Sequence, residues 1–75
     1  MNKTMFEMAA QLLHMTTEEA QRHYKEIPEE NACYFWNPIR GGASVIISET
    51  GEKLGATSSV SFERHLAAFK AGKRN

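Results

Sequence analysis

The chain has a single cysteine, no net charge and no long apolar run. One cysteine cannot form an intramolecular disulfide, whereas small secreted domains usually depend on several. The balance of nine basic and nine acidic residues lacks the positive charge that nucleic-acid binding requires. Glu7 and His14 interrupt the longest N-terminal apolar run, so no stretch approaches the roughly 18 residues of a membrane helix. These absences favour a cytoplasmic domain that binds neither DNA nor a membrane.

Size limits what the domain can do. Its 75 residues correspond to one domain, residues 1–75, and the 41% hydrophobic content is typical of globular proteins. So small a domain has little room for an enclosed active site, and its core is marginal. Residues 1–37 hold three basic and six acidic side chains, whereas residues 38–75 hold six and three. Opposite charges of this kind can attract another protein or a second copy, as a homodimer, although a solvated surface with a chance asymmetry of charge is the simpler explanation.

The stretch from Cys33 to Thr57 is the only part of the chain rich enough in β-branched and aromatic residues to form a sheet. Two apolar runs, residues 33–36 and 43–48, are separated by a loop with proline and two glycines, and a third run, residues 53–57, follows Gly51. Gly51 supplies the positive φ that a tight hairpin needs. The pattern predicts a three-stranded antiparallel meander.

Alternation along the middle strand assigns its faces. Val45 and Ile47 form the better core face, and we expect Leu54 and Ala56 of the third strand to lie beside them. The first strand is apolar on both faces, since Tyr34 and Trp36 alternate with Cys33 and Phe35. One of these two pairs must therefore cover something other than the main core.

Three helices are expected around the sheet. Apolar residues at helical spacing predict one over residues 2–15, and a Thr16–Glu19 capping box predicts a second over about 17–27, which Pro28 ends. A third begins after Ser59 or Ser61 and ends at Gly72. We expect an α+β fold, α-α-β-β-β-α, with the first and third helices on one face of the sheet. The predicted core consists of Met8, Leu12, Val45, Ile47, Leu54, Phe62, Leu66 and Phe69.

Catalytic and metal-binding patterns are weak. The three histidines, His14, His23 and His65, lie on three different expected helices without the spacing of a metal site. Cys33 and His65 could form a nucleophile and base, but no third group is signalled to orient them, and a buried strand cysteine with a surface histidine explains both. We therefore expect no catalytic residue, no metal and no cofactor.

Arg40, Gly41 and Gly42 form the one candidate anion site. Two glycines after an arginine would let backbone N–H groups approach an anion that the guanidinium also faces. The loop leads into a strand, however, whereas a phosphate loop leads into a helix. The glycines are thus required by the loop backbone alone, or they add a binding role for a small anion or nucleotide.

Tyr34 and Trp36 share one face of the first strand, and their amphipathic rings suit a surface that a partner covers. The alternative is that they pack beneath the first or second helix. In a three-stranded meander this strand is also an edge, because it has only one neighbour, and no lysine protects residues 33–37. The sequence therefore predicts that Tyr34, Trp36 and the strand edge contact a partner, with Arg40, Gly41 and Gly42 nearby.

The run from Tyr34 to Phe69 resembles small immunity-type domains of bacterial polymorphic toxin systems. Shared features are the aromatic strand, the glycine-bearing loop, the apolar strand Ser44 to Ile47, the Thr-Gly hairpin and the closing amphipathic helix. The chain departs from that group in its N-terminal helix pair and in lacking a Gly-x-Gly-Pro turn. The resemblance covers about half the chain. It implies a toxin-neutralising, protein-binding role without catalytic residues.

Overall fold

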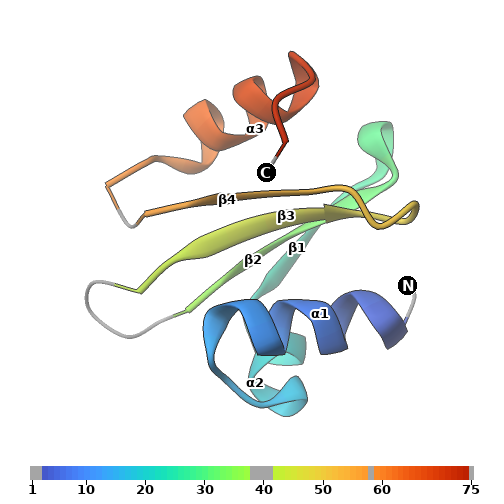
Figure 1. The fold of residues 1–75 in the computed structure, drawn as a ribbon, viewed down its shortest axis with the longest axis vertical. Helices are drawn as coiled ribbons and strands as arrows, with labels where there is room; N and C mark the ends of the chain where they lie inside the picture. The colour runs from blue at the N-terminus through green and yellow to red at the C-terminus, as the bar shows by residue number, and fades with distance from the viewer. Residues whose placement is uncertain (1–2, 38–41, 58, 75) are drawn as a thin grey trace.

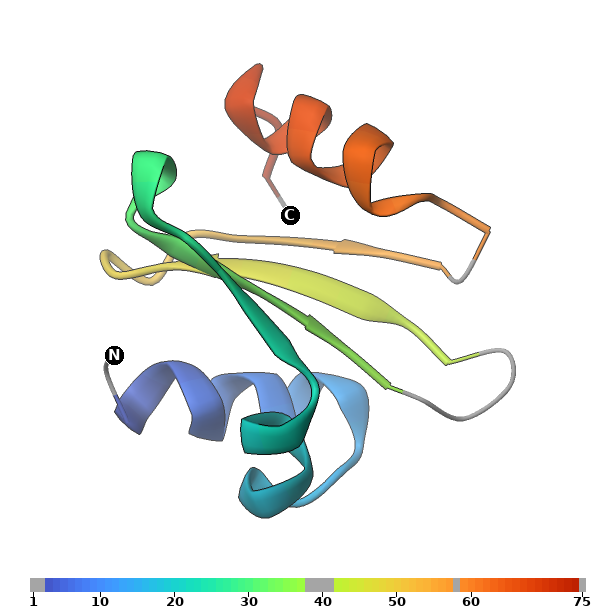
Figure 2. The same ribbon diagram turned by 180° about the vertical axis from the view of Figure 1, so that it is seen from behind.

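A four-stranded antiparallel sheet forms the middle layer of the domain, with helices on both of its faces (Figure 1, Figure 2). The computed structural model describes residues 3–37, 42–57 and 59–74. The strands lie in the order β1-β2-β3-β4, a simple meander. The elements in chain order are α1 (Lys3–Leu13), α2 (Thr17–Arg22), β1 (Tyr24–Ile27), a 3-10 turn (Pro28–Glu30), β2 (Ala32–Trp36), β3 (Ser44–Ser48), β4 (Lys53–Ala56) and α3 (Phe62–Lys70).

The α+β class is confirmed, but the predicted second helix is wrong over its second half. The capping box at Thr16 and Glu19 is present, yet α2 ends at Arg22, and Tyr24–Ile27 form a fourth strand. β1 pairs with β2 in antiparallel register, Tyr24 opposite Phe35 and Ile27 opposite Ala32. A four-residue turn that ends at Asn31, in the left-handed region with φ of 49°, joins the two strands. β2 therefore lies inside the sheet, and the prediction that it forms an edge is wrong.

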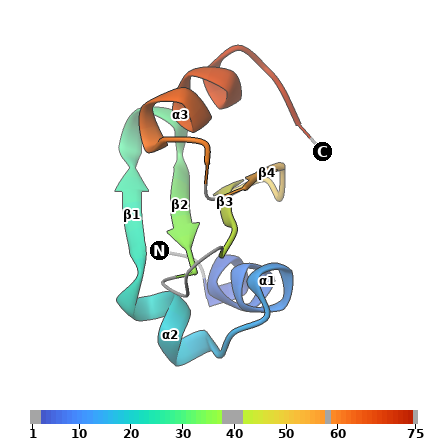
Figure 3. The same cartoon turned by 90° about the vertical axis from the view of Figure 1, so that its left-hand side faces the viewer.

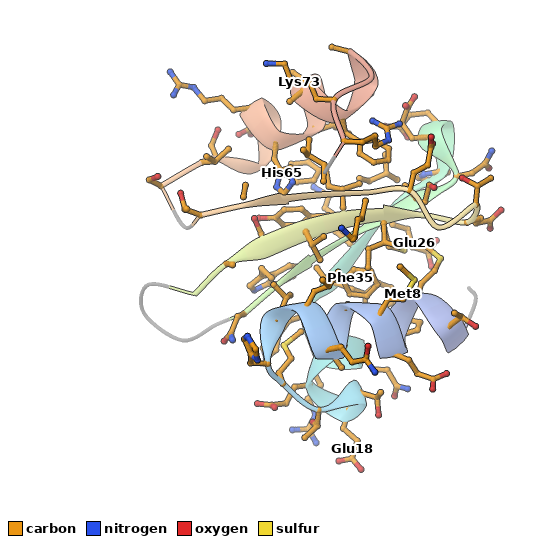
Figure 4. The ribbon with its side chains drawn as sticks, viewed as in Figure 1. Met8, Glu18, Glu26, Phe35, His65 and Lys73 are labelled. Atoms are coloured by element: carbon orange, nitrogen blue, oxygen red, sulfur yellow. The ribbon has the colours of Figure 1, made fainter. Side chains whose placement is uncertain are left out.

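The helices cover opposite faces of the sheet, which corrects the prediction that the first and third lie together. α1 packs on β2 and β3, whereas α3 packs on β3 and β4. Figure 4 shows Met8 and Phe35 between the sheet and α1, and His65 between the sheet and α3. Every residue of β3 is buried because both of its faces are covered. The sheet thus separates two apolar clusters.

The α1 cluster contains Val45 and Ile47, as predicted, together with Cys33 and Phe35. The α3 cluster is built on Ile46, which the sequence assigned to the less apolar face. Leu54 and Ala56 pair with Ile46 and Ser44, so they face α3 and do not lie beside Val45 and Ile47. The assignment of Leu54 and Ala56 is wrong because the β3–β4 register places Gly55 and Lys53 opposite Val45 and Ile47.

Most of the predicted core residues pack inside the domain. Phe69 is fully buried, and Met8, Leu54, Phe62 and Leu66 are partly buried against the clusters. The prediction that Leu12 lies in the core is wrong, because its side chain is 41% exposed and Leu13 is buried in its place, at 4% exposure. The face of α1 toward the sheet is thus rotated by one residue at its C-terminal end.

The predicted turn residues are confirmed. Gly51 has φ of 92° in the β3–β4 hairpin, and Gly72 has φ of 94° just after α3. Gly72 N–H and Lys73 N–H donate to the carbonyls of Phe69 and Ala68, the pattern of a Schellman C-cap. The Ser61 hydroxyl accepts a hydrogen bond from Arg64 N–H and begins α3.

Candidate functional site

Tyr34, Trp36 and Phe62 form a continuous aromatic surface on the α3 side of the sheet. The rings of Tyr34 and Trp36 stack, with centroids 5.6 Å apart and planes 26° apart. Phe62, from the first turn of α3, meets Tyr34 edge-on at 4.7 Å. The three side chains are partly buried. The alternation along β2 therefore places Tyr34 and Trp36 on one face, as predicted, and Phe62 joins them.

This aromatic surface lies beside α3, which packs chiefly on β3 and β4 and meets β1 at Lys25 and Ile27. The three rings line an open hollow of about 430 Å³, together with Lys25 of β1 and Glu63 of α3. Lys25 Nζ lies 4.5 Å from the centroid of the Phe62 ring, a cation–π contact. His23 meets Trp36 edge-on at 5.8 Å. The hollow thus combines apolar walls with one charge of each sign at its rim.

The strand beside the aromatic surface differs from the predicted one. β2 has neighbours on both sides, so the free edge next to Tyr34 and Trp36 belongs to β1 (Figure 3). β1 carries two exposed charges, Lys25 and Glu26. Lys25 and Phe62 were missed as members of the site in the sequence analysis. Reading Pro28 to Asn31 as a hairpin turn would have placed Lys25 opposite Tyr34.

His65 is almost fully buried, at 1% exposure, and is not the surface histidine that the sequence indicated. Its Nε2 lies 2.6 Å from the carbonyl oxygen of Leu54, and its Nδ1 lies 3.1 Å from Ser44 Oγ. A carbonyl can only accept, so Nε2 carries a proton and donates to Leu54. The ring thereby joins α3 to β3 and β4, and it also meets Tyr34 edge-on at 5.6 Å.

Cys33 and His65 belong to different faces of the sheet, so they form no nucleophile and base pair. Cys33 lies in the α1 cluster, whereas His65 lies under α3. Burial, followed by the negative charge of Glu26, raises the pKa of the Cys33 thiol to about 11. The thiol is therefore protonated near neutral pH, whereas a nucleophilic cysteine needs its thiolate.

The predicted anion loop is placed only in part. Arg40 and Gly41 lie outside the described residues, and Gly42 is partly buried ahead of β3. Asn37 N–H donates to the carbonyl of Ala43 at 3.0 Å, which extends the pairing of β2 and β3 toward the loop. The role of Arg40, Gly41 and Gly42 stays a prediction.

Lys70 and Arg74, near the basic end of the chain, each form an ion pair, and the pair of Lys70 joins the basic half of the chain to the acidic half. Lys70 Nζ lies 3.8 Å from Glu29 Oε1, and Arg74 Nη2 lies 3.6 Å from Glu52 Oε1. Arg74 also donates to the carbonyl of Phe69 and lies over its ring, 3.7 Å from the centroid. The basic end of α3 therefore has partners within the domain. Exposed pairs of this kind each stabilise a fold by about 0–1 kcal/mol.

Neither a metal cluster nor a membrane-spanning element is found in the described part of the chain. No three histidine, cysteine, aspartate or glutamate side chains among residues 3–37, 42–57 and 59–74 come close enough to hold a metal ion. Over the same residues, no helix combines the length and the apolar character needed to cross a bilayer.

Comparison of the chain with protein-family models, with curated proteins and with solved structures finds no match. The resemblance to immunity-type domains therefore stays a prediction from the residues of the sheet and the closing helix.

Proposed function

We propose that this domain is a non-catalytic protein-binding module that holds its partner on the aromatic surface of Tyr34, Trp36 and Phe62. One observation carries the proposal: a stacked tyrosine and tryptophan line an open hollow that the domain's own helices leave uncovered. Tryptophan and tyrosine are enriched among the residues that dominate binding free energies. On the resemblance to immunity-type domains, the partner would be a protein toxin.

The packing around the rings supports a binding role over a purely structural one. Edge and stacking contacts hold Tyr34 and Phe62 in place, so little side-chain entropy is lost when a partner covers them. Trp36 lies at the end of β2, with His23 on one side and Tyr34 on the other, and is only partly buried. Truncating it would therefore remove contact area for a partner more than it would open a core cavity.

The test compares Trp36→Ala with Leu12→Ala, a matched control that removes an exposed apolar side chain from the α1 side of the sheet. Each variant and the parent protein are immobilised and exposed to an extract of the native host, and a recovered partner is purified and titrated. We expect Trp36→Ala to weaken binding by about 2 kcal/mol, roughly 30-fold, and Leu12→Ala to leave it unchanged. A partner that binds all three proteins equally would contradict the proposal. A Trp36→Ala protein that does not fold would show that this ring belongs to the core.

A further inference from the structure

The free edge of β1 lies next to the aromatic surface. Trp36 N–H donates to the carbonyl of His23 at 3.2 Å, which fixes the hydrogen-bonding phase of the β1–β2 pair. In an antiparallel ladder, hydrogen-bonded and non-hydrogen-bonded pairs alternate. The Tyr24–Phe35 and Glu26–Cys33 pairs are therefore of the second kind. The N–H and C=O groups of Tyr24 and Glu26 point away from β2.

These four backbone groups face outward along the open side of β1. Figure 3 shows β1 at the margin of the sheet, with β2 on its inner side. None of the hydrogen bonds among the described residues uses these four groups. A row of unpaired strand groups is a template for one more strand.

A second copy of this chain fits the edge poorly. Paired residues must lie on the same face of the sheet, and all four outward groups are used only when Tyr24 of one copy lies opposite Glu26 of the other. That register places Lys25 directly opposite Lys25, in a non-hydrogen-bonded pair where the Cα atoms are only about 4.5 Å apart. Like charges directly opposite one another destabilise the pairing. A shift of two residues in one direction places Pro28, which has no N–H, opposite Tyr24, and a shift in the other direction places Arg22, which is helical, opposite Glu26.

An acidic strand fits the same register well. A carboxylate opposite Lys25 would meet its ammonium group, which already lies over Phe62 at the rim of the hollow. Side chains two residues away on that strand would lie beside Ile27 and His23, on the face of the aromatic surface. Lys25 thus connects the open edge to the hollow.

We propose that β1 accepts an extended segment of a partner protein as a fifth strand, with an acidic side chain of that segment opposite Lys25. This inference rests on the proposed function, because it states how the same partner meets the domain. The hydrogen bonds of Tyr24 and Glu26 supply the pairing, Lys25 selects the charge, and the aromatic surface receives the neighbouring side chains of the partner.

The first experiment uses two peptides of seven residues that alternate threonine and valine around a central glutamate or a central lysine, with both ends blocked. Each is titrated into labelled protein and followed by the amide resonances of Tyr24 and Glu26. We expect saturable shifts with the glutamate peptide and about tenfold weaker binding of the lysine peptide. Lys25→Glu should reverse this preference. No saturable shift at either amide, or equal affinities for the two peptides, would overturn the inference.

The second experiment separates the backbone from the side chain. Glu26→Pro removes an outward N–H without removing a β1–β2 hydrogen bond, and Glu26→Ala is the matched control that keeps the N–H. We expect Glu26→Pro to abolish binding of the glutamate peptide and Glu26→Ala to retain it; equal binding would contradict strand addition. Dimers in sedimentation that Glu26→Pro dissociates would show that a second copy occupies the edge.

The partner recovered with the Trp36→Ala series distinguishes the two proposals. If its binding depends on Trp36 but is equal for Glu26→Pro and Glu26→Ala, strand addition is wrong and the proposed function stands. If its binding depends on neither Trp36 nor Glu26, both proposals are wrong.

Discussion

His65 provides the sharpest test of how α3 is held on the sheet. The side chain lies at 1% exposure between the Ser44 hydroxyl and the Leu54 carbonyl. Replacing it with leucine removes the hydrogen bond to Leu54, worth about 0.5–1.5 kcal/mol, and leaves the buried Ser44 hydroxyl without its ring partner, a cost of about 1–3 kcal/mol. We expect His65→Leu to lower the free energy of unfolding by about 2–4 kcal/mol. That is a large part of the roughly 4–11 kcal/mol typical of a domain of this length.

A double-mutant cycle isolates the pair. Ser44→Ala alone should cost about 1–2 kcal/mol, because the buried Nδ1 loses its partner. Once His65 is leucine, the same Ser44→Ala change should cost almost nothing or stabilise the protein, so the two losses should fall short of additivity by about 1 kcal/mol or more. Urea denaturation of the four proteins, followed by circular dichroism, measures the cycle. Additive losses would refute the reasoning, since they would mean that Ser44 and His65 stabilise the fold independently.

Three further predictions concern single residues, and a fourth concerns the loop before β3. Burial raises the pKa of Cys33 from 9.0 to about 11, so the folded state holds the thiol proton more tightly than the unfolded state. The free energy of unfolding should therefore be unaffected by this thiol below pH 9 and should fall as pH rises toward 11. In urea denaturation at pH 8–11, Cys33→Ala should lack this part of the fall. His14 has φ of 55° directly after α1, so His14→Gly should raise the free energy of unfolding by about 0.5–1 kcal/mol, and a decrease would mean that its side chain stabilises the helix end. Thr16→Ala should cost about 1 kcal/mol by removing the α2 cap, whereas Thr17→Ala should cost much less in the same denaturation assay. Inorganic phosphate should cause no saturable shifts at Gly42 and Ala43 in amide spectra, and such shifts would favour the anion-binding alternative at Arg40, Gly41 and Gly42.

Local signals in the sequence placed most of the helices and turns. The cap at Thr16, the C-terminal glycine Gly72 and the hairpin glycine Gly51 depend on contacts within a few residues, and all three are confirmed. The faces of Val45 and Ile47 followed from alternation, which is equally local. These features are predictable because residues close together in the sequence decide each of them.

The missed strand was decided by contacts that are farther apart. Ala20, Tyr24 and Ile27 have helical spacing, so residues 17–27 matched a helix on the sequence alone. Pairing of Tyr24–Ile27 with β2 buries Ile27 under α3 and packs Tyr24 on Phe6, and this tertiary gain overrides local propensity. The error placed the free edge at β2, whereas it belongs to β1. Tyr34 and Trp36 were found nevertheless, because their shared face needs only the alternation of β2.

The meander has a consequence for folding inside the cell. Each strand pairs with the next one in the chain, and the two described turns, after Ile27 and after Ser48, have four residues each, so closing them costs little entropy. The meander and α1 can therefore form before α3 docks on the sheet. Until then Ile46, Ile27 and Ala32 lack the cover that Phe69 and its neighbours on α3 give them. A nascent or prematurely terminated chain would expose this apolar sheet face, and it is the species that we expect chaperones and proteases to recognise.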